Sequence, residues 1–202
     1  MVVFYLIGFV GMATDPNKFS RFTPFILLLT SILLFWMHPQ KNGYFYFSLS
    51  LIFIAALSLE IMGVQSGILF GEYKYGNALG LKIADTPVII GLNWVIVTYS
   101  SLQLVDRVSK KMGIKLNEYA GAGFAALAMV FLDILIEPIA PKLDYWYWQN
   151  DWVPVQNYTA WFFFGFAFCF WILKANLLYP NPMGWRVYVT QFVFFLSLNL
   201  LL

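Results

Sequence analysis

Apolar residues are gathered into seven long runs that are separated by short polar breaks. Most of the breaks contain proline or glycine, which commonly interrupt helices. A helix needs about 20 residues to cross the hydrocarbon core of a bilayer, and most of the runs approach that length. The pattern predicts an all-α fold, a single integral-membrane domain over residues 1–202 that forms a bundle of about seven transmembrane helices. The predicted segments are 1–13, 22–37, 45–68, 87–104, 119–139, 156–178 and 186–202.

The first segment and the two longest loops add detail to this prediction. Segment 1–13 is expected to be a helix, but it is short for a full span, so the bundle has six crossings if this segment does not traverse the bilayer. The remaining loops are short, so consecutive helices should be antiparallel neighbours. Loops 71–86 and 140–155 are then expected to cap the bundle on one side.

Composition agrees with a chain that lies in lipid. Hydrophobic residues make up 61% of the sequence and charged residues 11%, whereas a soluble domain carries about 25% charged residues. A net charge of +2 with no basic stripe does not favour a nucleic-acid partner. The single cysteine, Cys169, and the single histidine, His38, exclude an intramolecular disulfide and make a histidine–cysteine metal site unexpected, although carboxylates could still bind a metal.

Basic residues are distributed unequally between the two predicted sides. One side has seven lysines and arginines and the other has five, and the larger set includes the cluster from Arg107 to Lys115. The positive-inside rule therefore predicts that loop 105–118 is cytoplasmic.

Three acidic residues lie within the predicted spans, namely Glu60, Asp133 and Glu137. A carboxylate at the centre of a membrane helix costs about 2.5 kcal/mol or more on insertion scales, so such residues usually face the bundle interior and have a function. Alternation of the spans places all three acids in the half of the membrane that the two long loops cap. The same half receives the polar and aromatic residues Asn93, Trp94, Asn157 and Trp161.

Helical spacing predicts how these segments pack. Asp133 and Glu137 are four residues apart and share a helix face, as do Glu60, Gly63 and Gly67. The Gly63-Val-Gln-Ser-Gly67 pattern is typical of a helix that another helix approaches closely. Residues 120–128 are mostly alanine and glycine and predict a second tightly packed surface.

Each polar group also has a purely structural interpretation. Asn93 and Asn157 could hydrogen-bond one helix to another, and Asp133 or Glu137 could pair with a lysine, either Lys82 or Lys142. Trp146, Trp148 and Trp152 could form an interfacial aromatic belt. Glu60 is harder to explain in this way, because its own span contains no basic residue.

The residue types suit acid-initiated chemistry on an apolar substrate. A carboxyl group in an apolar site favours its neutral form and can act as a general acid, while a second one in a wetter position stays ionised. Aromatic faces nearby would stabilise a carbocation. The sequence has no phosphate-binding glycine motif, nucleophilic serine elbow or histidine cluster, and the acids of loop 71–86 lack DDxxD spacing.

Two ordered motifs resemble the integral-membrane carotenoid hydratases. The first runs from Glu60 to Gly80 and contains Gly63, Ser66-Gly67 and Phe70-Gly-Glu-Tyr-Lys-Tyr75, followed by Pro87 and Asn93-Trp94. The second is Asp133-Ile-Leu-Ile-Glu-Pro138, with Trp146-Tyr-Trp148, Pro154, Asn157 and Trp161 after it. The resemblance covers about residues 55–165.

This resemblance implies an enzyme that adds water to a terminal isoprenoid double bond of an acyclic carotenoid end, of the lycopene or γ-carotene type, without a redox or other cofactor. It also implies a bacterial or archaeal cytoplasmic membrane as the location. The catalytic candidates are Glu60, Asp133 and Glu137, with Asp133 preferred as proton donor and Glu60 as its partner. The candidates for binding substrate or water are Asn93, Trp94, Asn157, Tyr73, Tyr75, Asp85, Trp146, Trp148 and Trp161.

Two other functions are compatible with the same residues. A carotene cyclase would begin with the same protonation, but an internal alkene rather than water would trap the cation. A proton-coupled carrier could use intramembrane acids as a relay, although the inverted repeats common in such proteins are not visible here. Membrane lipid is the expected surrounding, and the sequence does not define an oligomeric state.

Overall fold

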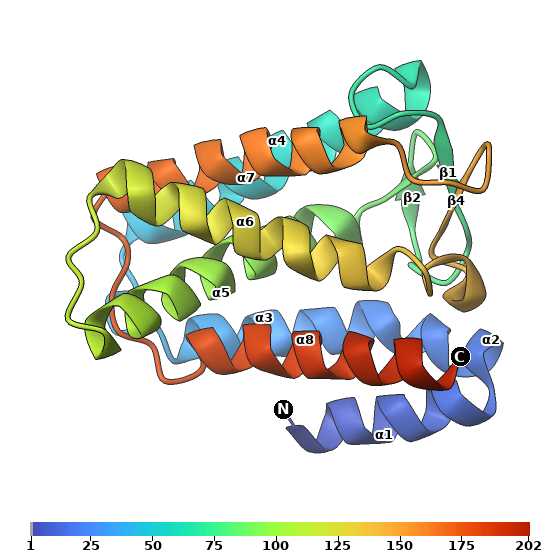
Figure 1. Cartoon of the computed structure of the whole chain (residues 1–202), viewed down its shortest axis with the longest axis horizontal. Helices are drawn as coiled ribbons and strands as arrows, with labels where there is room; N and C mark the ends of the chain where they lie inside the picture. The colour runs from blue at the N-terminus through green and yellow to red at the C-terminus, as the bar shows by residue number, and fades with distance from the viewer. Residues whose placement is uncertain (1) are drawn as a thin grey trace.

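The computed structural model describes residues 2–202, and in this range the chain forms a bundle of helices aligned along one long axis (Figure 1). The predicted all-α membrane bundle is confirmed. Four helical runs are long and apolar enough to span a membrane, namely residues Pro16–Trp36, Gly43–Ser66, Ile89–Lys111 and Glu118–Ile136. The elements are α1 (Val2–Thr14), α2 (Pro16–Phe19), the 3-10 turn Ser20–Phe22, α3 (Thr23–Trp36), α4 (Gly43–Ser66), α5 (Ile89–Lys111), α6 (Glu118–Ile136), the 3-10 turn Pro141–Leu143, α7 (Val155–Lys174) and α8 (Gly184–Leu201).

Helix α5 forms the centre of the bundle. It contacts α3, α4, α6, α7 and α8, and an unbroken stretch from Trp94 to Gln103 is buried. Where α5 crosses α4, a Cβ added to Gly91 would lie 2.9 Å from the backbone carbonyl oxygen of Phe53, so only glycine permits this approach. This close contact fixes the start of α5 beside the middle of α4.

The two glycine-rich surfaces predicted from sequence behave differently. The small residues of α6 do pack closely on α7: Ala122, Ala125 and Ala126 are fully buried, and a Cβ at Gly165 would meet the sulfur of Met129. The prediction that Gly63 and Gly67 receive another helix is wrong. The side chains of the loop that follows α4 cover Gly63, and Gly67 ends α4 in the left-handed conformation, with φ of 66°.

The two long loops cap the same end of the bundle, as expected, but each contributes a β-strand. Strand β1 (Tyr73–Tyr75) pairs in antiparallel fashion with β4 (Trp146–Trp148), and the register sets Tyr73 opposite Trp148 and Tyr75 opposite Trp146. A second small hairpin joins β2 (Lys82–Ile83) to β3 (Thr86–Pro87). Figure 1 shows β1, β2 and β4 together beyond the ends of the helices. Loops distant in sequence are thereby tied together above the bundle.

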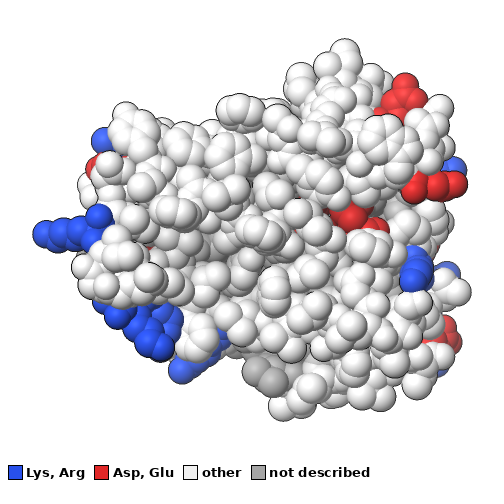
Figure 2. All heavy atoms as spheres, in the orientation of Figure 1, with Lys and Arg blue, Asp and Glu red and all other residues white. Residues whose placement is uncertain are grey.

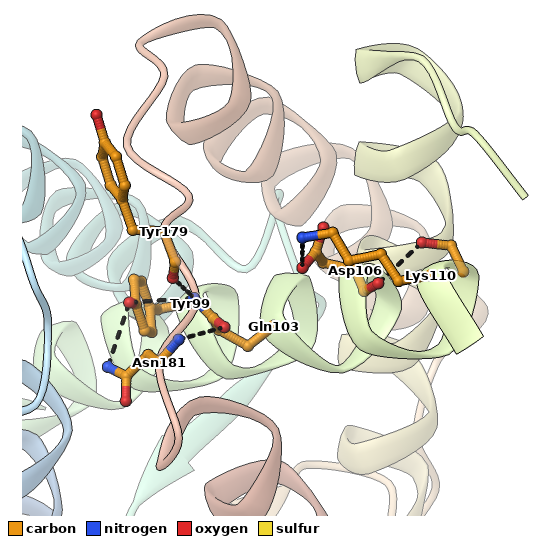
Figure 3. A network of polar contacts seen from close by, with 7 residues as sticks. Tyr99, Gln103, Asp106, Lys110, Tyr179 and Asn181 are labelled. Carbon is orange, nitrogen blue, oxygen red and sulfur yellow. Dashed lines mark hydrogen bonds and ion pairs between the residues drawn. The ribbon is translucent and has the colours of Figure 1, made fainter. Parts of the chain in front are cut away.

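A polar network fastens the opposite end (Figure 3). The side-chain amide of Gln103 on α5 donates hydrogen bonds to the Tyr99 hydroxyl at 3.1 Å and to the Tyr179 carbonyl at 2.7 Å. The Asn181 side chain, between α7 and α8, donates to the same Tyr99 hydroxyl at 3.3 Å. His38, which follows α3, shares a 2.7 Å hydrogen bond with Tyr99, and burial together with the charge of Lys41 lowers its pKa to about 4. A neutral histidine therefore belongs to a structural junction between three segments.

On the face that Figure 2 shows, most charged side chains lie toward the two ends of the bundle, and few lie between them. Lysine and arginine project mainly from the end where α5 connects to α6, which holds Arg107, Lys110, Lys111 and Lys115. The strand-capped end carries acidic side chains as well as basic ones. This distribution matches a protein whose middle lies in lipid and whose ends lie in water.

The polar junction around Asn181 makes a testable contribution to stability. We expect Asn181→Ala to lower the melting temperature of the detergent-purified protein, because it removes hydrogen bonds to the Leu34 carbonyl and the Tyr99 hydroxyl and leaves the buried Leu34 carbonyl without this donor, at a cost of about 1–3 kcal/mol. Asn150→Ala is the matched control, since Asn150 is exposed. Equal melting temperatures for both variants would contradict the assignment.

Candidate active site at the capped end of the bundle

The three membrane-depth acids converge on one small polar cavity of about 30 Å³ beneath the β1–β4 ribbon. The convergence predicted from the alternation of spans is therefore found in the structure. Helices α4, α5, α6 and α7 and both strands of the ribbon supply its walls. The lining residues are Glu60, Phe70, Tyr73, Tyr75, Ile90, Asn93, Asp133, Glu137, Trp146, Trp148, Asn157 and Trp161.

Glu60 is buried and accepts three hydrogen bonds. The hydroxyls of Tyr73 and Tyr75 donate to its Oε2 at 2.6 and 2.7 Å, and the indole N–H of Trp94 donates to Oε1 at 2.9 Å. Burial, and next the charge of Glu60, raise the pKa of Tyr73 and Tyr75 well above the ordinary tyrosine value, so both hydroxyls keep their protons and act as donors. Three donors on one carboxyl group favour its ionised form.

Glu137, which caps the C-terminus of α6, is surrounded in a similar way. The indole N–H groups of Trp146 and Trp148 donate to its Oε2 at 3.0 and 2.7 Å, and the Asn157 amide donates to Oε1 at 3.2 Å. In the ribbon, alternate residues point to the same face. The Tyr-Lys-Tyr and Trp-Tyr-Trp strands thus direct two hydroxyls and two indoles toward the carboxyl groups.

Asp133 has a different environment. It is buried, and Oδ2 accepts one hydrogen bond, from the Asn157 amide at 2.8 Å. Within residues 2–202, no donor contacts its Oδ1. The same Asn157 side chain links Asp133 to Glu137. Of the three carboxyl groups, Asp133 consequently has the fewest hydrogen-bond donors to stabilise a negative charge.

The structural interpretations of these acids find no support in the geometry. Lys82 donates to the backbone carbonyl of Tyr75 and Lys142 to that of Leu202. The ion pairs among the described residues join Lys110 to Asp106 and Lys174 to Glu118, so the three cavity acids have no cationic partner there. Trp146 and Trp148 line the cavity and hydrogen-bond to Glu137, whereas Trp152 is 58% exposed and fits an interfacial belt.

An aromatic wall completes the cavity. The rings of Trp94 and Trp161 stack with centroids 3.9 Å apart, and Phe168 meets Trp94 edge-on at 5.8 Å. Trp94 lies behind the wall, where it supports Glu60, while Trp161 lines the cavity itself. Trp161 therefore borders the cavity, where an aromatic ring can stabilise a positive charge.

Two of the predicted binding residues stand apart from this pattern. Asn93 lines the cavity but makes no side-chain hydrogen bond to residues 2–202, so its amide is available to a ligand. Asp85 does not reach the cavity. It lies exposed in the two-residue turn between β2 and β3, where Ala84 and Asp85 have φ of 46° and 62°, a conformation that aspartate tolerates better than most residues.

Sequence reasoning missed Phe70 and Ile90, which supply the apolar part of the lining. It also missed the strand pairing, although the alternation in Tyr73-Lys-Tyr75 and Trp146-Tyr-Trp148 is the period-two signal of a strand. Within the described part of the chain, no group of three or more histidine, cysteine, aspartate or glutamate residues is arranged to hold a metal ion.

Comparison with known proteins identifies a family for this chain. A family described as carotenoid biosynthesis protein matches residues 22–201. A relative from Haloarcula japonica, named bisanhydrobacterioruberin hydratase, is 26% identical over 183 residues, which cover 81% of this chain and 60% of the relative. No solved structure matches the chain. Because the family match extends over most of the bundle and includes every residue of the cavity, the chain belongs to the carotenoid biosynthesis protein family.

Proposed function

We propose that the protein hydrates a terminal isoprenoid double bond at an acyclic carotenoid end, of the lycopene or γ-carotene type, to give a tertiary 1′-hydroxyl. The observation that carries this proposal is the meeting of three buried carboxyl groups, without a cationic partner among residues 2–202, in a cavity of about 30 Å³. About 10–15 Å³ suffices for a water molecule, so the cavity has room for the second reactant. The named activity of the Haloarcula japonica relative belongs to the same class of reaction.

Hydrogen bonding supports Asp133 as the proton donor. Three carboxyl groups around so small a cavity cannot all be ionised, because like charges repel strongly where water is scarce. Glu60 and Glu137 each accept three hydrogen bonds, whereas Asp133 accepts one. The proton therefore resides most favourably on Asp133, on the Oδ1 atom that no donor within residues 2–202 contacts.

The reaction follows from this distribution of protons. The π electrons of the alkene take the proton of Asp133 at C2′, which leaves a carboxylate on Asp133 and a tertiary cation at C1′. Water attacks C1′, and Glu60 accepts the proton that the water loses. The sum is addition of one water molecule, and the proton on Glu60 must return to Asp133 before the next cycle. The two carboxyl groups line the same cavity, and bridging water would carry that proton between them.

Two features of the cavity lower the energy of the cationic intermediate. Asp133 and Glu137 place negative charge beside it, and the face of Trp161 offers the negative side of an aromatic quadrupole. Asn157 holds the two acids in a fixed relation. The uncommitted amide of Asn93 is positioned to orient the attacking water.

We also propose an orientation for the bundle. The basic end, with loop 105–118, faces the cytoplasm of a bacterial or archaeal cell, and the acids lie toward the opposite surface of its cytoplasmic membrane. The excess of lysine and arginine at that end supports this orientation (Figure 2).

Removal of the proton donor should abolish the reaction. In cells that make lycopene or γ-carotene, we expect Asp133→Asn to lower hydroxylated product by at least about 100-fold, because general acid catalysis contributes about 10²–10⁴-fold. Glu60→Gln should also lose most activity, since the amide cannot accept all three hydrogen bonds. Asp85→Asn and Glu72→Gln are matched controls at exposed positions. Full product from both site variants would refute the assigned roles.

Product mass separates hydration from cyclisation, which would begin with the same protonation. With ¹⁸O-labelled water, we expect the product of the wild-type protein to gain the mass of one labelled water and to carry the label on the new hydroxyl. An unlabelled product with the mass of the substrate would show that an internal alkene traps the cation. No change in pigment, with pH-dependent solute uptake instead, would favour a proton-coupled carrier.

The orientation can be tested because the natural cysteine is buried. In intact cells, a membrane-impermeant maleimide should label Lys142→Cys at the capped end but label Lys111→Cys only after the cells are opened. The reverse labelling pattern would show that the bundle has the opposite orientation in the membrane. The unmodified chain, with Cys169 alone, gives the background.

A further inference from the structure

A second cavity adjoins the polar one and is larger and mostly apolar. Its volume is about 140 Å³, and α1, the 3-10 turn before α3, and helices α3, α5, α6 and α8 contribute to its walls. Three residues, Ile90, Asn93 and Trp146, line both cavities and form the boundary between them. Leu132, the neighbour of Asp133 in α6, also lines the apolar cavity.

The volumes of the two cavities indicate which molecule each can hold. The polar cavity of about 30 Å³ accommodates water but no branched hydrocarbon. The apolar cavity of about 140 Å³ is close in size to an engineered apolar cavity of about 150 Å³ that binds benzene, a six-carbon ligand. A five-carbon isoprene unit therefore matches it. We propose that the apolar cavity binds the terminal isoprene unit of the substrate, so that the alkene meets acid and water at the boundary marked by Asn93 and Trp146. This inference rests on the proposed function and adds to it the location of the substrate.

The same cavity has an opening that suits a long polyene. Phe4 and Ile7 on α1 and Phe22 before α3 line it and are 42%, 57% and 54% exposed on the apolar side of the bundle. The remainder of the carotenoid can leave between α1 and α3 and continue in the bilayer. Burial of only the end of the molecule requires no tunnel through the protein.

Helix α1 is the outer wall of this cavity, and it lies outside the residues that match the family, 22–201. It packs on α8, where Tyr5 meets Phe194 edge-on at 5.4 Å. Gly8 lines the cavity, and a Cβ there would lie 3.7 Å from the ring of Phe194, which is an ordinary contact. Position 8 can therefore receive a side chain that takes up cavity space without a clash at its Cβ. We infer that α1 limits the size of the carotenoid end that this chain accepts.

A larger side chain at position 8, which would fill part of the apolar cavity, tests the inference. We expect Gly8→Leu to lower hydroxylated product at least tenfold in a lycopene-producing host. Gly123→Leu is the matched control, because Gly123 is a helical glycine with open space around its Cβ position and lies in neither cavity. Protein abundance in the membrane and the melting temperature are measured for both. If Gly8→Leu does not fold, Ile26→Phe on α3 fills the same cavity and replaces it.

Binding is measured separately from turnover, in the Asp133→Asn background. The ratio of pigment to protein after purification should fall at least fivefold when Gly8→Leu is added and stay unchanged when Gly123→Leu is added. A folded Gly8→Leu protein with wild-type product and wild-type pigment would overturn the inference. If the wild-type protein makes no hydroxylated product, the proposed function fails. Loss of bound pigment on plugging would then still support the cavity as the carotenoid site.

Discussion

A carboxyl group buried in a membrane bundle must find hydrogen-bond donors within the protein, because burying it without them costs several kcal/mol. This chain buries three such groups together and gives them no basic side chain among residues 2–202. The donors are neutral: two tyrosine hydroxyls, three indole N–H groups and one amide. Neutral donors stabilise a negative charge without cancelling it, so the cavity can still stabilise a cation. A lysine in the same place would hold the acids ionised and repel that cation.

This requirement explains the strand-capped end of an otherwise helical protein. Four of the six donors lie on the β1–β4 ribbon, whose antiparallel register sets Tyr73 opposite Trp148 and Tyr75 opposite Trp146. A two-stranded ribbon is marginally stable by itself. Here its hydrogen bonds to Glu60 and Glu137 tie it to α4 and α6, and the acids and the ribbon therefore stabilise one another. Loss of either acid should therefore weaken the attachment of the β1–β4 ribbon to the helices as well as the proposed activity.

Much of this arrangement could be predicted from sequence, because hydrophobic runs fix the helices and their alternation fixes depth. That was enough to place Glu60, Asp133 and Asn157 in one half of the membrane. The depth of a residue in the membrane does not tell which way its helix is rotated or which loop segments pair as strands. The glycines after Glu60 were predicted to pack against a helix, yet Gly67 ends α4 in a left-handed turn. Asp85 shares a loop with the cap but lies at the tip of a hairpin, facing water. Local sequence does not contain the tertiary contacts that decide such details.

In the proposed reaction, the unequal number of hydrogen-bond donors sets the direction of proton transfer. If Asp133 had as many donors as Glu60, both would favour ionisation, and neither would protonate an alkene at an appreciable rate. The side-chain amide of Asn157 is shared between Asp133 and Glu137, so the ionised form of Asp133 is only weakly stabilised. Leu132 and Ile136, beside it on α6, face the apolar cavity. In the proposed reaction, the acid that still holds its proton when the alkene arrives is thus on α6, which lines both the polar and the apolar cavity, where an alkene would receive the proton and water would end the reaction.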